Sequence, residues 1–400
     1  MTGSGATSGE ATRTPLDDHV AARIRRRGPI GFAEVMEVAL YDPDHGFYAS
    51  GGEAGRRGDF LTSPEVGPLF GAVLANALDA WWVEAGRPDP FVVVEAAAGR
   101  AMLARTILLA APACASALTY VLVERSAALR AVHGDHLELT AAELAFPPQP
   151  DDDDDPGTSR HPGLATGPRI VSLASLPAFA CAHVVLANEL LDNLPVDVLV
   201  ALGAPGIDRT WEEVRVALDA DDATLVELVV PTSPSRSARA GALAPDASQG
   251  ARIPMLDAAG DWLRDALGTV VEGRVVVVDY AASTATLADR PDGAWLRTYR
   301  AHERGGPPLV ALGTQDITAE VATDQLDAVA RIDRDESQAE FLVRFGIDDL
   351  VADGRRVWHE RAEIGDLQAI RARSRVREAE ALLDPDGLGA FRVLEWLVTR

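Results

Sequence analysis

The chain of 400 residues contains no lysine, and all 37 of its basic residues are arginine. This absence excludes reactions that need a lysine amine, such as Schiff-base formation, and a P-loop site, whose lysine reaches the phosphates. The 61 acidic residues give a formal net charge of −24. The surface as a whole therefore does not attract nucleic acid or an anionic membrane, although a local basic patch could.

Cysteine and long apolar runs are also scarce. Cys114 and Cys181 are too few for a disulfide scaffold or a four-thiolate zinc site, and their apolar neighbours indicate buried structural thiols. No run of about 18 apolar residues is present, and the N-terminal stretch lacks the apolar region of a secretory signal. We therefore expect a soluble cytoplasmic protein with no metal, no nucleic-acid partner and no membrane span.

Short β-branched runs alternate with helical patterns in the middle of the chain. Hydrophobic residues make up 47% of the sequence, which is enough for a sizeable core. The expected strands are Phe91–Glu95, Leu118–Glu124, Ile170–Ser172, His183–Ala187 and Arg274–Tyr280. The expected helices between and around them are Arg100–Ala111, Ser126–Val132 and Met255–Leu267. This alternation predicts a doubly wound α/β sheet that binds its ligand at the carboxyl ends of the parallel strands.

Composition predicts four regions along the chain. A Gly/Ser/Thr-rich tail (1–18), expected to be disordered, precedes a helical N-terminal cap (19–86), a central α/β core (87–317) and a C-terminal helical region closing on the core (318–400). Two stretches of the core, near 147–168 and 231–250, have the composition of surface insertions. The first contains five consecutive aspartates, Asp151 to Asp155, whose mutual repulsion favours a solvated loop.

The turn after the first expected strand is the first candidate ligand site. Its acid Glu95 is followed by small residues, including Ala97, Gly99 and Ala101, and then by a helix. Nucleotide-binding folds begin in this way, because small residues let the backbone approach the ligand at a helix N-terminus. Glu124, which ends the next strand, suits a ribose diol. The alternative is an ordinary alanine-rich turn in an alanine-rich chain.

Three polar blocks supply further candidates. Gly58–Glu65 (GDFLTSPE) has the residues of a turn followed by a capped helix start with proline near its first position. Asn188–Pro195 (NELLDNLP) follows the fourth strand, and Glu189 and Asp192 share a face there if the turn is helical. Asp279–Ala281 follows the fifth strand. Simple capped or polar turns remain the alternative for these blocks.

Blocks of this kind appear in a family order. The sequences concerned are GPIGFAEVMEVALYDPDHGFYA, GDFLTSPEVGPLFG, FVVVEAAAGRAML, YVLVERSAALR, ANELLDNLPV, VVVVDYA, LRTYRAHERGGPPL, TQDITAEV and QAEFLVRFGI. From Gly28 to Ile347, roughly four-fifths of the chain, they resemble the MidA-type class I S-adenosylmethionine-dependent methyltransferases. That family includes the mitochondrial complex I assembly factor that methylates a protein arginine. The resemblance implies a seven-stranded Rossmann-like methyltransferase sheet with added helices, and a protein substrate.

The resemblance also implies site roles. The family turn reads Glu-x-Gly-x-Gly-x-Gly, and this chain has alanine at two of its three glycine positions; each alanine costs about 1 kcal/mol where φ is positive. The residues expected to bind S-adenosylmethionine are Glu95, Ala97, Gly99, Ala101, Glu124, Gly58, Thr62 and Asn188.

Transfer of a methyl group to a guanidine needs carboxylates that bind and orient the guanidinium. The residues expected to do this chemistry are Glu189 and Asp192, with Asp59 lining the site and His302 as a proton acceptor. A surface role for His302 is the alternative.

Two other functions stay open from the sequence. The altered turn favours a non-catalytic relative that keeps the fold for binding or assembly, whereas the intact polar blocks favour an enzyme. A methyltransferase of small molecules is the third option. A homodimer is compatible with the sequence but not indicated by any motif.

Overall fold

The computed structural model describes residues 13–49, 62–146, 167–203, 209–300, 303–364 and 366–399. Contacts divide the chain into two compact units, each made of three separate segments. We call the first the antiparallel unit (residues 1–53, 193–258 and 282–324) and the second the parallel-sheet unit (54–192, 259–281 and 325–400). These limits differ from the boundaries expected at 86 and 317, because strands from the middle of the chain pair with the N-terminal segment.

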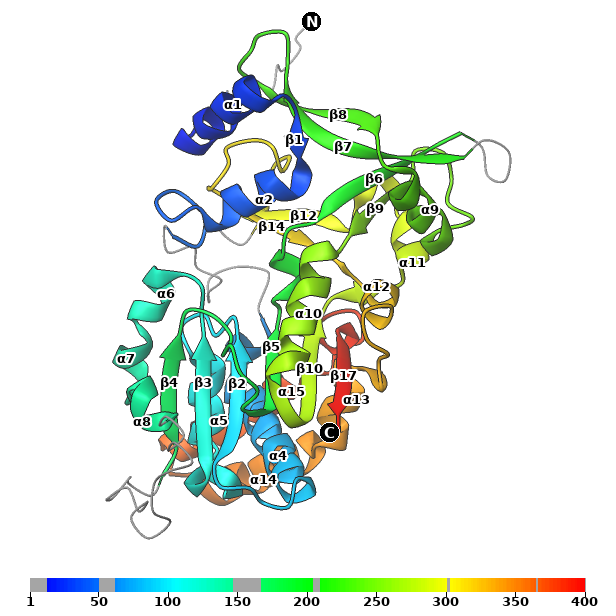
Figure 1. The fold of residues 1–400 in the computed structure, drawn as a ribbon. Coiled ribbons are helices and arrows are strands. Elements are labelled where there is room, and N and C mark those ends of the chain that lie inside the picture. The colour runs from blue at the N-terminus through cyan, green and yellow to red at the C-terminus, as the bar shows by residue number, and fades with distance from the viewer. Residues whose placement is uncertain are drawn as a thin grey trace, which may run out of the picture. The chain divides into compact units, whose positions relative to one another are not determined.

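A seven-stranded sheet forms the centre of the parallel-sheet unit (Figure 1). In sheet order its strands are β16 (Arg334–Ser337), β17 (Arg392–Val398), β10 (Val270–Asp279), β5 (Ala182–Asn188), β2 (Phe91–Ala96), β3 (Leu118–Val123) and β4 (Arg169–Leu173). The five strands from β10 to β4 are parallel, whereas β17 runs antiparallel to both of its neighbours. All five strands expected from the sequence are confirmed, and the apolar C-terminal stretch is the antiparallel strand.

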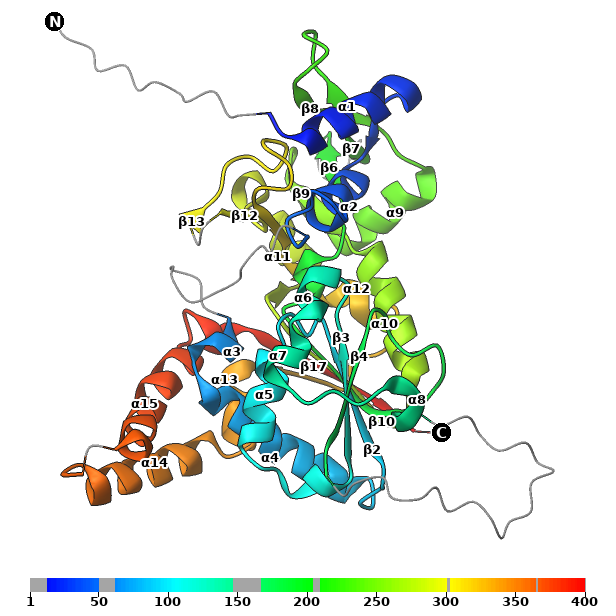
Figure 2. The same ribbon diagram turned by 90° about the vertical axis from the view of Figure 1, so that its left-hand side faces the viewer.

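Helices cover both faces of this sheet (Figures 1 and 2). The strands β2 and β3 are buried along their whole length, which explains their β-branched sequences. On one face α4 (Pro68–Glu84), α5 (Met102–Leu109) and α13 (Gln338–Arg344) contribute to one hydrophobic core with them, and α10 (Asp257–Thr269) lies on the other. The remaining helices of this unit are α3 (Ser63–Val66), α6 (Ala127–Ala131), α7 (His133–His136), α8 (Ala142–Ala145), α14 (Ile347–Arg361) and α15 (Leu367–Leu382).

The antiparallel unit is built on two smaller sheets. The larger contains β1 (Ile30–Gly31), β6 (Asp197–Leu202), β7 (Thr210–Leu218), β8 (Leu225–Pro231) and β9 (Arg252–Met255). The smaller contains β12 (Leu296–Arg300), β13 (Glu303–Arg304) and β14 (Asp316–Ala319). Its helices include α1 (Pro15–Arg27), α2 (Phe32–Tyr41), α9 (Pro234–Leu243) and α11 (Thr284–Ala288).

One expected surface insertion contains a helix that packs on a sheet. The stretch 231–250 carries α9, which packs on β7, and Ala240 and Ala244 are buried in a cluster with Trp211. Most other residues of the stretch are exposed, so it is a surface helix held by a narrow stripe of small residues, and its origin as an insertion stays a prediction. The other expected insertion, 147–168, lies almost entirely outside the described residues.

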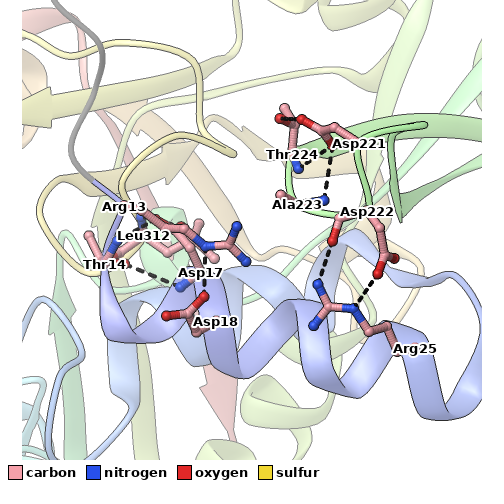
Figure 3. Close-up of polar contacts among 10 residues, drawn as sticks. All are labelled: Arg13, Thr14, Asp17, Asp18, Arg25, Asp221, Asp222, Ala223, Thr224 and Leu312. Carbon is pink, nitrogen blue, oxygen red and sulfur yellow. Dashed lines mark hydrogen bonds and ion pairs between the residues drawn. The ribbon is translucent and has the colours of Figure 1, made fainter.

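Polar contacts with other segments hold both ends of the first helix, α1 (Figure 3). The Thr14 hydroxyl accepts the Asp17 N–H at 3.2 Å and donates to the Leu312 carbonyl at 3.0 Å, and an Asp17 oxygen accepts the Leu312 N–H at 3.1 Å. At the other end Arg25 binds the carboxylate of Asp222, at 2.8 Å, and its carbonyl, in the turn between β7 and β8. The tail expected over 1–18 therefore overlaps a capped helix.

Three expectations from composition concern the whole chain. Cys114 is buried as expected, whereas Cys181 is only partly buried. Among the described residues, no helix is long and apolar enough to cross a membrane, and no cluster of three metal-ligating side chains occurs.

Gly273 provides a test of the sheet. It lies where the register of β10 against β5 shifts, has φ +143°, and an added Cβ would come within 1.9 Å of the His183 carbonyl oxygen. We expect Gly273→Ala to lower the free energy of unfolding by about 2 kcal/mol, measured by chemical denaturation. The control is Gly268→Ala in α10, where nothing lies within 4 Å of the added methyl. This variant should gain about 0.5 to 1 kcal/mol, and equal stabilities of the two variants would contradict the described backbone.

Candidate cofactor and catalytic site

Four loops meet at one edge of the parallel sheet. They follow β2, β3, β5 and β10, whose parallel pairing places their carboxyl ends at the same side. Ligands of doubly wound folds bind at this edge. The residues that the sequence singled out are therefore brought to the expected place, and their individual contacts decide what each can do.

The turn after β2 has an unusual backbone. Ala97, Gly99 and Ala101 all have left-handed dihedrals, with φ values of +57°, +53° and +62°. Glycine adopts this conformation without cost, whereas each alanine pays on the order of 1 kcal/mol. The turn is held by the Ala98 N–H, which donates to the Val123 carbonyl at 3.0 Å, and by the Ala101 N–H, which donates to the Ala98 carbonyl at 2.7 Å.

The two alanines of this turn differ in their surroundings. Ala101 is fully buried in the core that includes Leu103 and Ile107 of α5, whereas Ala97 is partly exposed. The methyl group of Ala101 therefore fills core space that a glycine would leave empty, and it does not point from the turn toward a ligand. Of the two departures from a glycine-rich turn, only Ala97 can crowd a ligand there.

Glu124 joins the turns after β2 and β3. One of its carboxylate oxygens accepts the Gly99 N–H at 2.9 Å, and the other accepts the Ser126 N–H at 2.7 Å. Burial raises the pKa of this carboxyl, and backbone donors at Ser126, Gly99 and Arg125, together with the charge of Arg130, act against that shift. A carboxylate has about four acceptor positions, so Glu124 retains acceptor capacity toward a ribose.

Glu95 is buried at the end of β2. Its side chain is 4% exposed, and the Tyr120 hydroxyl donates to its carboxylate at 2.7 Å. Burial raises its pKa to about 8, opposed by hydrogen bonds from Tyr120 and from the backbone of Ala104 in the first turn of α5. These contacts place Glu95 beneath the turn, where it supports the start of α5. A direct contact with the cofactor stays a prediction.

Glu189 is held by three donors from three segments. One carboxylate oxygen accepts the side-chain amide of Asn188 at 3.1 Å and the Ser63 N–H at 3.4 Å, and the other accepts the Tyr280 hydroxyl at 3.3 Å. Burial, together with the charge of Asp279, raises its pKa to about 8. The partly buried carboxylate is thus fixed in one orientation at the edge of the sheet.

Asp192 and Glu189 do not lie in one helical turn. The helical turn is a short 3-10 segment, Leu191–Asn193, and Glu189 lies before it with φ +51°. Asp192 is 3% exposed, and its N–H, like that of Leu191, donates to the carboxylate of Asp279, at 3.3 and 2.9 Å. The condition for a shared face, a helical turn that includes both residues, is therefore not met, because the left-handed Glu189 lies before the 3-10 segment. The catalytic role of Asp192 stays a prediction.

Other expected site residues are only partly accounted for. Gly58, Asp59 and His302 lie outside the described residues. Thr62 precedes α3, and its N–H donates to Glu65 at 3.3 Å, so the capped helix start with proline is confirmed.

Several residues of the site have contacts that the sequence did not predict. Tyr280 and Ser63 hold Glu189, Asp279 organises the turn after β5, and His133 contacts the turn after β2. Asp279 and Tyr280 stood in the block Asp279–Ala281 and Ser63 in the block Gly58–Glu65, but their partners, like those of His133, lie far away in the sequence. No local pattern predicts such contacts.

The sheet order, the turn after β2 and the acid after β3 together define the fold of the class I methyltransferases. Residues 73–341 match the model of the family described as "Putative S-adenosyl-L-methionine-dependent methyltransferase", and the chain belongs to this family. A solved structure of a COG1565 superfamily member and likely methyl transferase from Burkholderia thailandensis, bound to S-adenosyl-homocysteine, is 27% identical. Its TM-score is 0.76, and the match covers 96% of this chain and 92% of that one.

Curated relatives agree with this assignment. The chain is 29% identical to protein arginine methyltransferase NDUFAF7, mitochondrial, of Danio rerio, over 82% of this chain and 76% of that protein. It is 27% identical to the Homo sapiens protein of the same name, over 82% of this chain and 71% of that protein. A shorter match to the Drosophila melanogaster homologue is 38% identical over 26% of this chain, and it spans 24% of that protein's length.

The residues present fit S-adenosylmethionine, the cofactor of the family. The methyl group of Ala101 is turned into the core, and Glu124 stands at the end of β3 with acceptor capacity for a diol. The backbone of the turn from Ala97 to Ala101 and the carboxylate of Glu124 would hold the cofactor. The resemblance found in the sequence is therefore confirmed for fold, family and cofactor.

The two alanines of the turn can be tested separately. We expect Ala97→Gly to raise the free energy of unfolding by about 1 kcal/mol, because it relieves a left-handed alanine without removing core packing. Ala101→Gly should gain less, because it also removes a buried methyl group worth about 1 kcal/mol. Chemical denaturation measures both, and calorimetric titration of S-adenosylhomocysteine shows whether Ala97→Gly also tightens binding. A larger gain for Ala101→Gly would contradict the description of the turn.

Proposed function

We propose that the protein transfers a methyl group from S-adenosylmethionine to an arginine side chain of a protein substrate. The observation that carries the proposal is Glu189, a carboxylate fixed at the cofactor edge by Asn188, Tyr280 and Ser63. The names of the zebrafish and human relatives support the same acceptor. A net charge of −24 favours approach of a basic protein segment.

The chemistry of a guanidinium acceptor explains the need for such a carboxylate. A bound guanidinium presents parallel N–H groups to a carboxylate, which orients one nitrogen and stabilises the positive charge. The cofactor, when bound, supplies an electrophilic methyl group on a sulfonium. Because the attacking nitrogen must lose a proton as it gains the methyl group, an acceptor with a pKa near the working pH is favourable. Glu189, with its pKa raised to about 8, meets this requirement.

A non-catalytic role is the second candidate, and it rests on the altered turn. Its support is reduced by the position of Ala101, whose methyl group lies in the core. Asn188 and Tyr280 also fix Glu189 at the ligand edge, a feature that a simple scaffold does not need.

Removal of the Glu189 charge tests the proposal. Glu189→Gln should lower methyl transfer to an arginine-containing protein substrate by about 100-fold, or ~2.7 kcal/mol of barrier, with cofactor affinity within about threefold of wild type. The matched control is Glu143→Gln, the same change at an exposed position in α8. Asp192→Asn should chiefly lower thermal stability, because Asp192 is buried in the short helical turn. An unchanged transfer rate in stable Glu189→Gln would refute the role of this carboxylate.

The pKa of Glu189 predicts a pH profile. Because burial and Asp279 raise this pKa to about 8, the fraction of charged Glu189 increases as the pH rises from 7 to 9, while the arginine stays protonated. We expect kcat/KM to rise about tenfold over this interval, following the titration of a single group with that pKa. The residual activity of Glu189→Gln should lack this rise. A profile that falls between pH 7 and 9 would contradict the assignment.

A further inference from the structure

His133 is a fully buried histidine beside the cofactor turn. It is the first residue of α7, and its exposed fraction is 0%. Its ring nitrogens have two defined neighbours: Nε2 lies 2.8 Å from the Gly99 carbonyl oxygen, and Nδ1 lies 2.9 Å from the Ser172 hydroxyl at the end of β4. The ring therefore bridges the turn after β2 and the carboxyl end of β4.

These two neighbours define the tautomer. A carbonyl oxygen only accepts hydrogen bonds, so Nε2 must carry the proton and donate to Gly99. In the neutral ring Nδ1 is then an acceptor, and the Ser172 hydroxyl donates to it. Burial lowers the pKa of His133. The hydrogen bond with the Gly99 carbonyl opposes this shift, and the charges of Arg130 and His136 add to it, so the net shift in pKa favours the neutral ring.

The bond from His133 completes the support of Gly99. Its N–H is held by Glu124 and its carbonyl by His133, so both polar backbone atoms of this residue are fixed by buried side chains. In a trans peptide the carbonyl points opposite to the next N–H. His133 therefore also sets the direction of the Arg100 N–H, which belongs to the segment leading into α5.

We propose that His133 is a positioning residue for the cofactor: it holds the left-handed turn Ala97–Ala101 in its binding conformation through the Gly99 carbonyl. Without this bond, one fewer hydrogen bond stabilises the strained left-handed alanines of the turn. The turn then has to be ordered when the cofactor binds, and this ordering lowers the affinity. The proposal rests on cofactor binding at this turn, and it is independent of the identity of the methyl acceptor.

Three substitutions separate the two hydrogen bonds of the ring. The amide nitrogen of Gln occupies the place of Nε2 and that of Asn the place of Nδ1, so His133→Gln keeps a donor for Gly99 whereas His133→Asn keeps only contact with Ser172. His133→Leu removes both. In calorimetric titration with S-adenosylhomocysteine, we expect Kd within about threefold of wild type for the Gln variant and weakened at least tenfold for the Asn and Leu variants.

Thermal unfolding without ligand distinguishes positioning from a general loss of stability. The proposal expects the Gln and Asn variants to have similar melting temperatures but different Kd values. Equal Kd values for these two variants, or unchanged affinity in all three, would overturn it. Failure of arginine methylation with normal binding of S-adenosylhomocysteine would count against the proposed function alone.

A measurement on the wild-type protein tests the assignment of the His133 tautomer without requiring that any variant folds. Long-range nitrogen–proton NMR correlations report which nitrogen of a histidine carries the proton. We expect His133 to be a neutral Nε2–H tautomer from pH 6 to 8, with and without S-adenosylhomocysteine. An Nδ1–H tautomer or an imidazolium in the free protein would overturn the assignment.

Discussion

The parallel pairing of β2 between β3 and β5 is the constraint on which the site depends. Because these strands run in one direction, Glu124, Asn188 and the turn after Ala96 emerge at the same edge. A change of direction in any one strand would send its polar residues to the opposite edge. The buried β-branched sequences of β2 and β3 fix this arrangement before any ligand contact is made.

Buried side chains stabilise the turns that follow the parallel strands. The turns after β2 and β5 at this edge contain residues with left-handed backbones, at Ala97, Gly99, Ala101 and Glu189. The hydrogen bonds of a regular helix or strand do not stabilise such turns. Carboxylates accept hydrogen bonds from backbone N–H groups there: Glu124 accepts from Gly99, and Asp279 accepts from two residues in the turn after β5. The low exposure of these acids raises their pKa values, so the same burial that shapes the turns also tunes the acid–base chemistry of the edge.

The sequence was sufficient for the parallel strands, the family and the cofactor, because continuous apolar runs and ordered motif blocks are local signals. It was insufficient for β7, whose alternating sequence TWEEVRVAL belongs to a half-exposed antiparallel strand and contains no long apolar run. The relation of Glu189 to Asp192 depended on one left-handed dihedral, which residue type does not reveal. His133 lies just after the expected helix Ser126–Val132 and in no motif, and its importance arises from partners 34 and 39 residues away.

The position of β17 has a consequence for how the chain folds. The strand β10 ends at Asp279, but the strand that covers its outer edge begins only at Arg392. During synthesis, the apolar edge of β10 must therefore wait for more than a hundred further residues before it is paired. An unpaired apolar edge is a template for association with other chains. Folding of this protein is thus most exposed to aggregation before β17 is made, and truncations that remove β17 would leave that edge open permanently.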